Sequence, residues 1–226
     1  MNEARTDPVE EELCPRCLKP LSLNICDTIA PIDNRIELLV LQHPQEQDKE
    51  LGTARLAVLS LKRAALKIGL SWPSLAKAAG HPADPHAWAV LYLGSTRPRD
   101  FPQGDEVAVF DRSGKAVPDQ RAALAGIKGI VVLDGTWSQA KTLWWRNPWV
   151  LKARRIAVNP QRPSLYGKLR REPRREGLST LESAALLLSR LEGRPEIEAA
   201  MTATLSRLLD RYRARQKERS AGAAAQ

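Results

Sequence analysis

A run of four aliphatic residues, 130–133, is the feature that most constrains the fold of this chain. A strand that is apolar on both faces is typical of the interior of a parallel sheet, because helices then cover both sides. Asp134 follows the run directly, and a helical pattern begins at Thr136. Similar strands alternate with helical patterns along the chain. The sequence therefore predicts an α/β fold with a largely parallel sheet.

The other expected elements follow from hydrophobic periodicity and from proline and glycine breaks. Strands are expected at residues 35–42, 88–93, 130–133 and 155–158. Helices are expected at residues 52–70, 136–146, 179–191 and 196–218, and the stretch 95–126 is expected to be mostly loop with a short helix at 119–125. We divide the chain into a disordered acidic leader, a small cysteine-rich segment, one α/β domain and a flexible tail, at residues 1–13, 14–31, 32–219 and 220–226.

Asp134 stands where a ligand would bind in a sheet of this kind. In open α/β sheets, ligands bind beyond the carboxyl ends of the strands. Thr136 is a natural helix N-cap, and Gln139 three residues later completes a capping box. These residues either belong to a ligand site or only cap the helix, and spacing alone favours neither interpretation.

Two further turns are candidates for the same site. Ser179 and Glu182 repeat the capping box at the start of the next predicted helix. Two helix N-termini near one site would offer N–H groups to a carboxylate or phosphate, although spacing alone favours plain capping here. Leu93, Gly94 and Ser95 follow another strand, where glycine would let a ligand approach the backbone or would form an ordinary turn.

The net charge of +9 is concentrated in one block. Residues 146–175 contain ten basic residues and a single acid, Glu172, so the rest of the chain is neutral overall. Four of the six tryptophans lie between residues 137 and 149, beside this block. Arginines next to aromatic rings are typical of surfaces that hold RNA phosphates and stack bases. The alternatives are a solvated basic surface and tryptophans packed in the core.

The three cysteines, Cys14, Cys17 and Cys26, are odd in number and argue against a disulfide framework. The C-x-x-C spacing of the first two suits tetrahedral zinc. Three sulfurs leave a fourth position, for which His43 is a candidate. The alternative is a metal-free loop with buried or free thiols.

The apolar stretches of the chain are short. A helix that spans a membrane needs about 20 mainly apolar residues, and none of the stretches approaches that length. Residues 1–13 are acidic and polar, unlike a secretory signal. We therefore expect a cytoplasmic protein without membrane contacts.

Several motifs, in order along the chain, resemble the DTW domain family, which is named for an Asp-x-Thr-Trp motif. That motif is Asp134-Gly-Thr-Trp137 here, and the others are C-P-R-C at 14–17, C-D-T-I-A-P at 26–31, Q-H-P-Q-E at 42–46 and L-S-T-L-E at 178–182. Residues 52–56, G-T-A-R-L, keep part of the N-T-G-R-L that members often carry. The resemblance covers about residues 14–190. It departs at Asn24, which stands where the family has a cysteine and so bears on zinc binding.

The resemblance implies a knotted, SPOUT-like α/β domain and a tRNA-uridine aminocarboxypropyltransferase. Such an enzyme moves the 3-amino-3-carboxypropyl group of S-adenosyl-methionine to N3 of a uridine and releases methylthioadenosine. Uridine N3 must lose a proton in this reaction, and Asp134 is our candidate for the general base. The rival hypotheses are an S-adenosyl-methionine-dependent RNA methyltransferase and a non-catalytic RNA-binding protein.

The resemblance and the three turns together give the expected contact residues. The expected cofactor contacts are Leu93, Gly94, Ser95, Leu133, Gly135, Thr136, Trp137, Leu178, Ser179 and Thr180. The expected contacts with tRNA are Arg154, Arg155, Tyr166, Arg170, Arg171, Arg174 and Arg175. Tyr166 and Trp137 are expected to stack on the target base or on the adenine of the cofactor.

Overall fold

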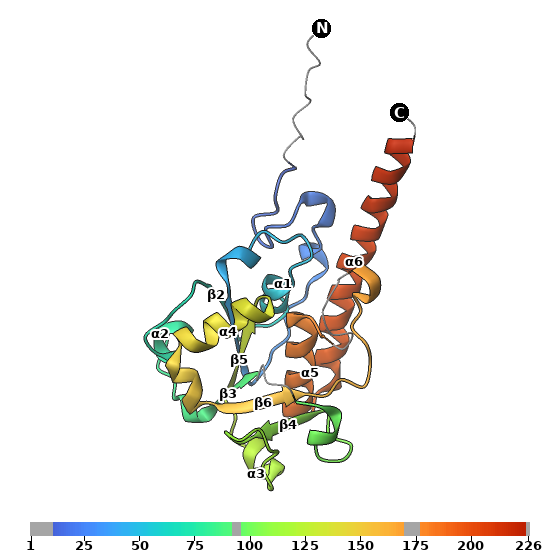
Figure 1. Ribbon diagram of the computed structural model, residues 1–226. Coiled ribbons are helices and arrows are strands. Elements are labelled where there is room, and N and C mark those ends of the chain that lie inside the picture. Colours follow the sequence, from blue (N-terminus) through green and yellow to red (C-terminus); the bar gives the residue numbers. More distant parts are fainter. Residues whose placement is uncertain (1–10, 92–95, 170–176, 225–226) are drawn as a thin grey trace.

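The computed structural model describes residues 11–91, 96–169 and 177–224. Its centre is a six-stranded sheet with the strand order β2-β1-β5-β3-β6-β4 (Figure 1). Five of the strands are parallel, and β4 at one edge runs antiparallel to β6. The strands are β1 (Glu37–Gln42), β2 (Ala64–Ile68), β3 (Trp88–Leu91), β4 (Val107–Phe110), β5 (Gly129–Asp134) and β6 (Arg154–Val158). The predicted α/β class with a mostly parallel sheet is confirmed.

Strand β5 lies between β1 and β3, and its side chains alternate between two hydrophobic cores. Ile130 and Val132 pack into one core with α1 (Ala54–Leu59), α5 (Thr180–Glu192) and α6 (Pro195–Ala224). Val131 and Leu133 pack into the other with α2 (Leu75–Ala79) and α4 (Trp137–Arg146). Figure 1 shows the two groups of helices on opposite faces of the sheet. The run 130–133 is apolar throughout because both of its faces are covered.

The predicted helix at residues 52–70 is wrong over its second half. The helix α1 ends at Leu59, and β2 then adds to the open edge of β1 with Leu38 opposite Ala64 and Gln42 opposite Ile68. Helical spacing of apolar residues is a weak signal for so short a segment, and pairing with β1 satisfies backbone groups that would otherwise be left at a sheet edge.

The stretch 95–126, predicted to be mostly loop, contains the strand β4. Its four residues are all buried, and Val107 pairs with Val158 of β6. The short helix predicted at 119–125 is present as α3 (Gln120–Leu124), with Asp119 as its N-cap. A four-residue strand with no alternating pattern gives periodicity too little to detect.

The last helix, α6, continues to Ala224, past the end predicted at residue 218 and into the predicted flexible tail. It packs against α5 and extends well beyond the sheet (Figure 1). Near its far end, the buried Arg215 forms ion pairs with Glu50 and with Glu11 at 3.2 Å. The helix is therefore attached to the cysteine-rich end of the molecule. Within the described ranges, no helix is long and apolar enough to cross a membrane.

Candidate active site

Asp134 lies at the carboxyl end of β5, directly opposite Gln42 at the end of β1. The Gln42 side-chain amide donates a hydrogen bond of 2.8 Å to Asp134 Oδ2. The hydroxyl of Thr180, the first residue of α5, donates to Asp134 Oδ1. Two strand ends and one helix start therefore meet at a single carboxylate.

The Asp134 carboxylate receives its hydrogen bonds from neutral groups, and in the described ranges it forms no ion pair. It is partly exposed. A carboxylate oxygen can accept two hydrogen bonds, so each oxygen keeps a free position after the bonds from Gln42 and Thr180. The arrangement can therefore accept a proton or attract a cationic ligand without first breaking a salt bridge.

The turn after β5 is shaped by close packing on the first turn of α4. The capping box predicted at Thr136 and Gln139 is present. The backbone N–H of Thr136 donates to Gln139 Oε1 at 2.7 Å, and the backbone N–H of Gln139 donates to Thr136 Oγ1 at 3.4 Å. A Cβ atom on Gly135 would lie 2.8 Å from the Gln139 Cβ, so only glycine fits this turn. The Ser138 amide has no protein partner in the described part of the chain.

The start of α5 is occupied by the protein's own groups. Ser179 and Glu182 form the predicted capping box, and the Leu181 amide donates to Thr53 Oγ1 at 3.3 Å. The Glu182 carboxylate also accepts from the Ser164 hydroxyl at 2.8 Å and from the Leu165 amide at 2.7 Å. The plain capping that spacing favoured is therefore present at Ser179. Of the two helix starts, that of α4 is the more open to an anion.

A cleft of about 540 Å³ adjoins the start of α5. It lies between the segment 160–165, α5 and α6, and Leu178 and Leu186 are among its apolar lining. Arg190, which pairs with Glu106 at 2.6 Å and with Glu198 at 2.8 Å, contributes a charged wall. The volume of the cleft is within the range of small-molecule sites. Of the expected cofactor contacts, Leu178 alone is among its described lining residues.

Several expected contacts lie outside the described residues. They are Leu93, Gly94 and Ser95 after β3, and Arg170, Arg171, Arg174 and Arg175 in the basic block. The remaining expected cofactor contacts belong to the turn after β5 and to the start of α5, and the hydrogen bond between Thr180 and Asp134 joins these two segments. They are Leu133, Gly135, Thr136, Trp137, Leu178, Ser179 and Thr180. Among them, Leu133 and Ser179 are buried, Thr136 is exposed, and the Trp137 side chain is 37% exposed at the first position of α4.

Of the remaining expected RNA contacts, Tyr166 is buried. Its side chain is only 3% exposed and its hydroxyl donates to the Leu51 carbonyl, so its ring has no face open to a base in this conformation. Arg154 donates to the carbonyls of Ala123 and Ala125, where it holds the end of α3. A tyrosine next to arginines in the sequence can lie in the core or on the surface, and the sequence pattern alone does not distinguish the two.

Arg155 holds two surface segments together. Its guanidinium lies 5.7 Å from the centre of the Trp144 ring and donates to the Arg112 carbonyl at 3.2 Å. A cation over an aromatic face is attracted by the ring, and the hydrogen bond fixes the turn that carries Arg112. Arg155 therefore links α4 to the turn after β4.

The three cysteines form one buried cluster. The Sγ atoms of Cys14, Cys17 and Cys26 all lie within 4.8 Å of one another, and those of Cys14 and Cys26 are 3.8 Å apart. Thiolates on a tetrahedral zinc, with Zn–S bonds of about 2.3 Å, lie about 3.8 Å apart, so the cluster fits that ion. Asn24 lies beside it, with its Oδ1 3.7 Å from Cys17 Sγ. His43, the suggested fourth ligand, is not part of the group.

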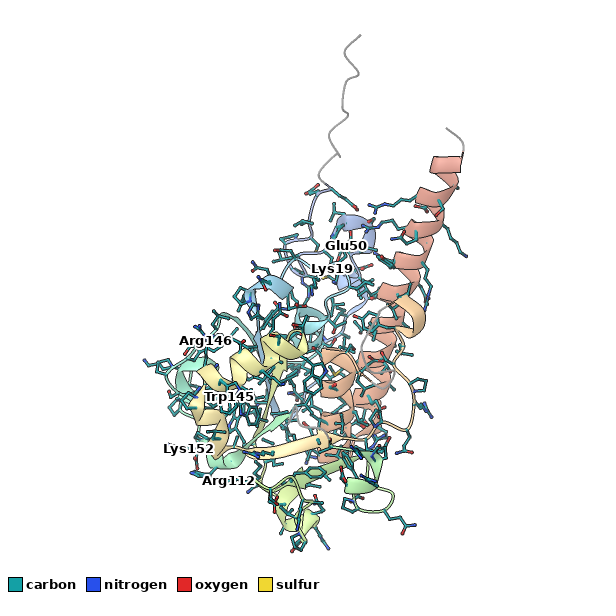
Figure 2. The ribbon with its side chains drawn as sticks, in the orientation of Figure 1. Lys19, Glu50, Arg112, Trp145, Arg146 and Lys152 are labelled. Atoms are coloured by element: carbon teal, nitrogen blue, oxygen red, sulfur yellow. The ribbon has the colours of Figure 1, made fainter. Side chains whose placement is uncertain are left out.

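A lysine is buried next to the cysteine cluster. Lys19 donates to the carbonyls of Glu50 and Gly52, and Figure 2 shows it beside Glu50 at the end of the molecule near the N-terminus. Burial lowers the pKa of the Lys19 ammonium to about 8, although the charges of Cys17 and Glu50 act against that shift. Burial also raises the pKa of the Cys26 thiol to about 12. Without a metal, this thiol therefore stays protonated at neutral pH.

Gln42 is a site residue that the sequence analysis missed. It lies in the motif at 42–46, whose pattern alone indicates no position at the site. The available signal was that a polar residue ends the apolar strand 35–42, as Asp134 ends the run 130–133. Parallel strands end at the same edge of a sheet, so two such residues on neighbouring strands meet.

Comparisons with known proteins identify the family of this chain. The profile of the DTW domain matches residues 11–213. The tRNA-uridine aminocarboxypropyltransferase 2 of Drosophila melanogaster is 26% identical over 212 residues, which cover 89% of this chain and 75% of the relative. Proteins of the same name from Macaca fascicularis and Mus musculus are 29% and 27% identical, over 86% and 79% of this chain and 61% and 56% of their own lengths. No solved structure matches the chain.

Proposed function

This chain belongs to the DTW domain family, and we propose that it transfers the 3-amino-3-carboxypropyl group of S-adenosyl-methionine to N3 of a uridine in tRNA. The names of the relatives support the activity and the class of RNA. The observation that carries the proposal is the Asp134 carboxylate, held at the carboxyl edge of the sheet by Gln42 and Thr180. A cytoplasmic location and a SPOUT-like knot remain predictions.

Asp134 is proposed as the group that takes the N3 proton. The bound cofactor would supply a sulfonium that makes the neighbouring methylene carbon open to attack. Asp134 would take the N3 proton in the transfer, and methylthioadenosine would leave with the electrons of the broken carbon–sulfur bond. The hydrogen bonds from Gln42 and Thr180 fix the direction of the carboxylate lone pairs that remain.

The groups at the sheet edge suit two of the three charged groups of the cofactor, its carboxylate and its sulfonium. The α4 start, with Thr136 and the Ser138 amide, favours the methionyl carboxylate, because a helix N-terminus carries positive partial charge. Asp134, without an ion pair in the described ranges, favours the sulfonium. Leu133, Gly135 and Trp137 are proposed to complete this side, with Leu178, Ser179 and Thr180 opposite. Leu93, Gly94 and Ser95 are expected to close the site.

Zinc is proposed at Cys14, Cys17 and Cys26, where it would hold the cysteine-rich segment in place. The fit rests on the spacing of the three sulfurs. Asn24, which replaces a family cysteine, lies close enough to Cys17 to stand next to the ion or to a water molecule on it. The role would be structural, since the cluster is buried.

Product analysis tests the proposed function against its rivals. Purified protein is incubated with S-adenosyl-methionine and unmodified tRNA, and the nucleosides and small products are separated by mass spectrometry. We expect aminocarboxypropyl-uridine and methylthioadenosine in equal amounts. Methylated nucleosides with S-adenosyl-homocysteine would instead establish a methyltransferase, and bound but unchanged tRNA would establish a non-catalytic RNA-binding protein.

A further inference from the structure

Trp145 is the most exposed of the large hydrophobic side chains in the described ranges, at 75%. It lies on the outer face of α4, whose inner face buries Ala140 and Leu143. One exposed aromatic residue is common on protein surfaces and has no meaning alone. The residues around Trp145 indicate that its exposure has a function.

Trp145 belongs to a stripe that begins at the candidate active site. Trp137, Lys141 and Trp145 are four residues apart, so they lie along one face of α4, and all three are exposed. Each step of four residues advances about 6 Å along a helix. The stripe therefore leads from the turn after Asp134 to a second ring about 12 Å farther along the helix.

Basic side chains lie on the same side of the molecule as the outer end of this stripe. Figure 2 shows Arg146, Trp145, Lys152 and Arg112 along the same side of the molecule. Arg112, Arg146 and Lys152 are exposed and, in the part of the chain that the structure describes, form no ion pair. No acidic residue occurs in the sequence between Asp134 and Glu172. These positive charges are therefore not neutralised by an acidic side chain in the described ranges.

Packing beneath the surface places Arg112 on the same side of the molecule as Trp145, Arg146 and Lys152. It comes from the turn after β4, far from α4 in the sequence. Arg155 lies over Trp144 and donates to the Arg112 carbonyl, and so it holds that turn against α4. Three elements thus contribute to one outer surface: α4, the 3-10 helix Pro148–Lys152 and the turn at Arg112.

We propose that this surface, made of Trp137, Lys141, Trp145, Arg146, Lys152 and Arg112, binds the unpaired nucleotides next to the target uridine. The proposal rests on the proposed function for the identity of the RNA. Trp145 stacks on one base, while the cations contact the phosphates on either side. An aromatic ring flanked by unpaired cations matches single-stranded RNA, in which bases are free to stack. The surface replaces Tyr166 as the stacking position.

Two variants and a matched control test the proposal. Trp145→Ala removes the ring, and Arg112→Ala/Arg146→Ala/Lys152→Ala removes three charges. The control Lys62→Ala/Lys217→Ala/Arg219→Ala removes the same charge from exposed positions elsewhere. Binding to a tRNA transcript is measured by fluorescence anisotropy at several salt concentrations, together with melting temperature and cofactor affinity.

We expect Trp145→Ala to weaken tRNA binding about tenfold, and Trp145→Phe to restore most of it, because stacking needs a ring. The triple variant should lower the slope of log affinity against log salt by about two, since about 0.7 counterions are released per single-strand phosphate contacted. The control should change neither quantity by more than about twofold. Melting temperature and cofactor affinity should stay unchanged, since these side chains are exposed.

Unchanged tRNA affinity in both surface variants would overturn the proposal. So would conversion of a wild-type dimer into monomers by Trp145→Ala, because the ring would then serve a protein interface. Both results are separable from failure of the proposed function. If the wild type binds tRNA through Trp145 but forms no product, the surface stands and the transferase activity fails. If the wild type forms product and the variants bind normally, the activity stands and the surface fails.

Discussion

The Thr180 hydroxyl donates a hydrogen bond to the Asp134 carboxylate across 46 positions of sequence. This bond joins the start of α5 to the end of β5, and Gln42 completes the arrangement from β1. The carboxylate is oriented by groups that carry no charge. No positive side chain in the described ranges pairs with this carboxylate, and the first two predictions test whether it acts as the proposed base.

Asp134→Asn should fold normally and bind S-adenosyl-methionine within a few-fold of the wild type, but transfer the group about a hundredfold to ten-thousandfold more slowly. Asparagine keeps the shape but cannot take the proton. The asparagine oxygen can still accept from Thr180, and Gln42 can turn its amide to accept from the new NH2 group, so both hydrogen bonds keep a partner. Single-turnover transfer to tRNA measures the effect, and a near-normal rate would make Asp134 a structural residue.

Thr180→Val should lower kcat about tenfold and leave KM nearly unchanged, because it removes the hydrogen bond to Asp134 but keeps the size of the side chain. Thr180→Ser, which keeps the hydroxyl, should restore most of the rate. Steady-state kinetics with both substrates separates this positioning effect from a loss of cofactor binding. A rise in KM alone would place Thr180 in binding rather than in orientation of the base.

Protein purified without a chelator or an affinity tag should contain one zinc per chain, bound by Cys14, Cys17 and Cys26. Cys26→Ser should lose the metal and lower the melting temperature, since structural zinc contributes directly to folding. Asn24→Ala removes a neighbour but no thiolate, so it should keep the metal. Elemental analysis decides the matter, and wild-type protein without metal would rule out the proposed site.

Arg215→Ala should destabilise the protein by about 2 kcal/mol, because Arg215 is buried and its hydrogen bonds to charged groups are lost. The matched control is Arg213→Ala on the same helix, which breaks an exposed pair with Asp210 at 3.0 Å and should cost less than about 0.5 kcal/mol. Urea unfolding of both variants measures the difference. Equal effects would show that the network with Glu11 and Glu50 does not hold α6 in place.

The parts of the fold that the sequence predicted are those with strong local signals. The run 130–133 gave the central strand, and the capping boxes at Thr136 and Ser179 gave the starts of α4 and α5. The strands β2 and β4 were missed because both lie at sheet edges, where pairing with a distant neighbour decides the structure.

The same limit applies to the site. The sequence indicates Asp134 as a candidate because a charged residue directly after an apolar strand is unusual. Gln42 is neutral, and only its place opposite Asp134 in the sheet reveals its role. The burial of Tyr166 could not be predicted because its neighbours in sequence are basic, whereas its neighbours in space are in the core. Local composition carries no information about which side of a segment faces the interior.

Glu182 caps α5 and also connects the start of this helix to the segment at Ser164 and Leu165. Its carboxylate accepts from Ser164 and Leu165, in the segment that leads toward the basic residues 168–175, while Thr180 two residues earlier contacts Asp134. If the proposed function holds, RNA bound at that segment would act on the same helix end that orients Asp134. By thermodynamic linkage, any gain in the alignment of Asp134 on docking must be matched by tighter docking when Asp134 is aligned. RNA binding and the orientation of Asp134 would then depend on the same conformational equilibrium.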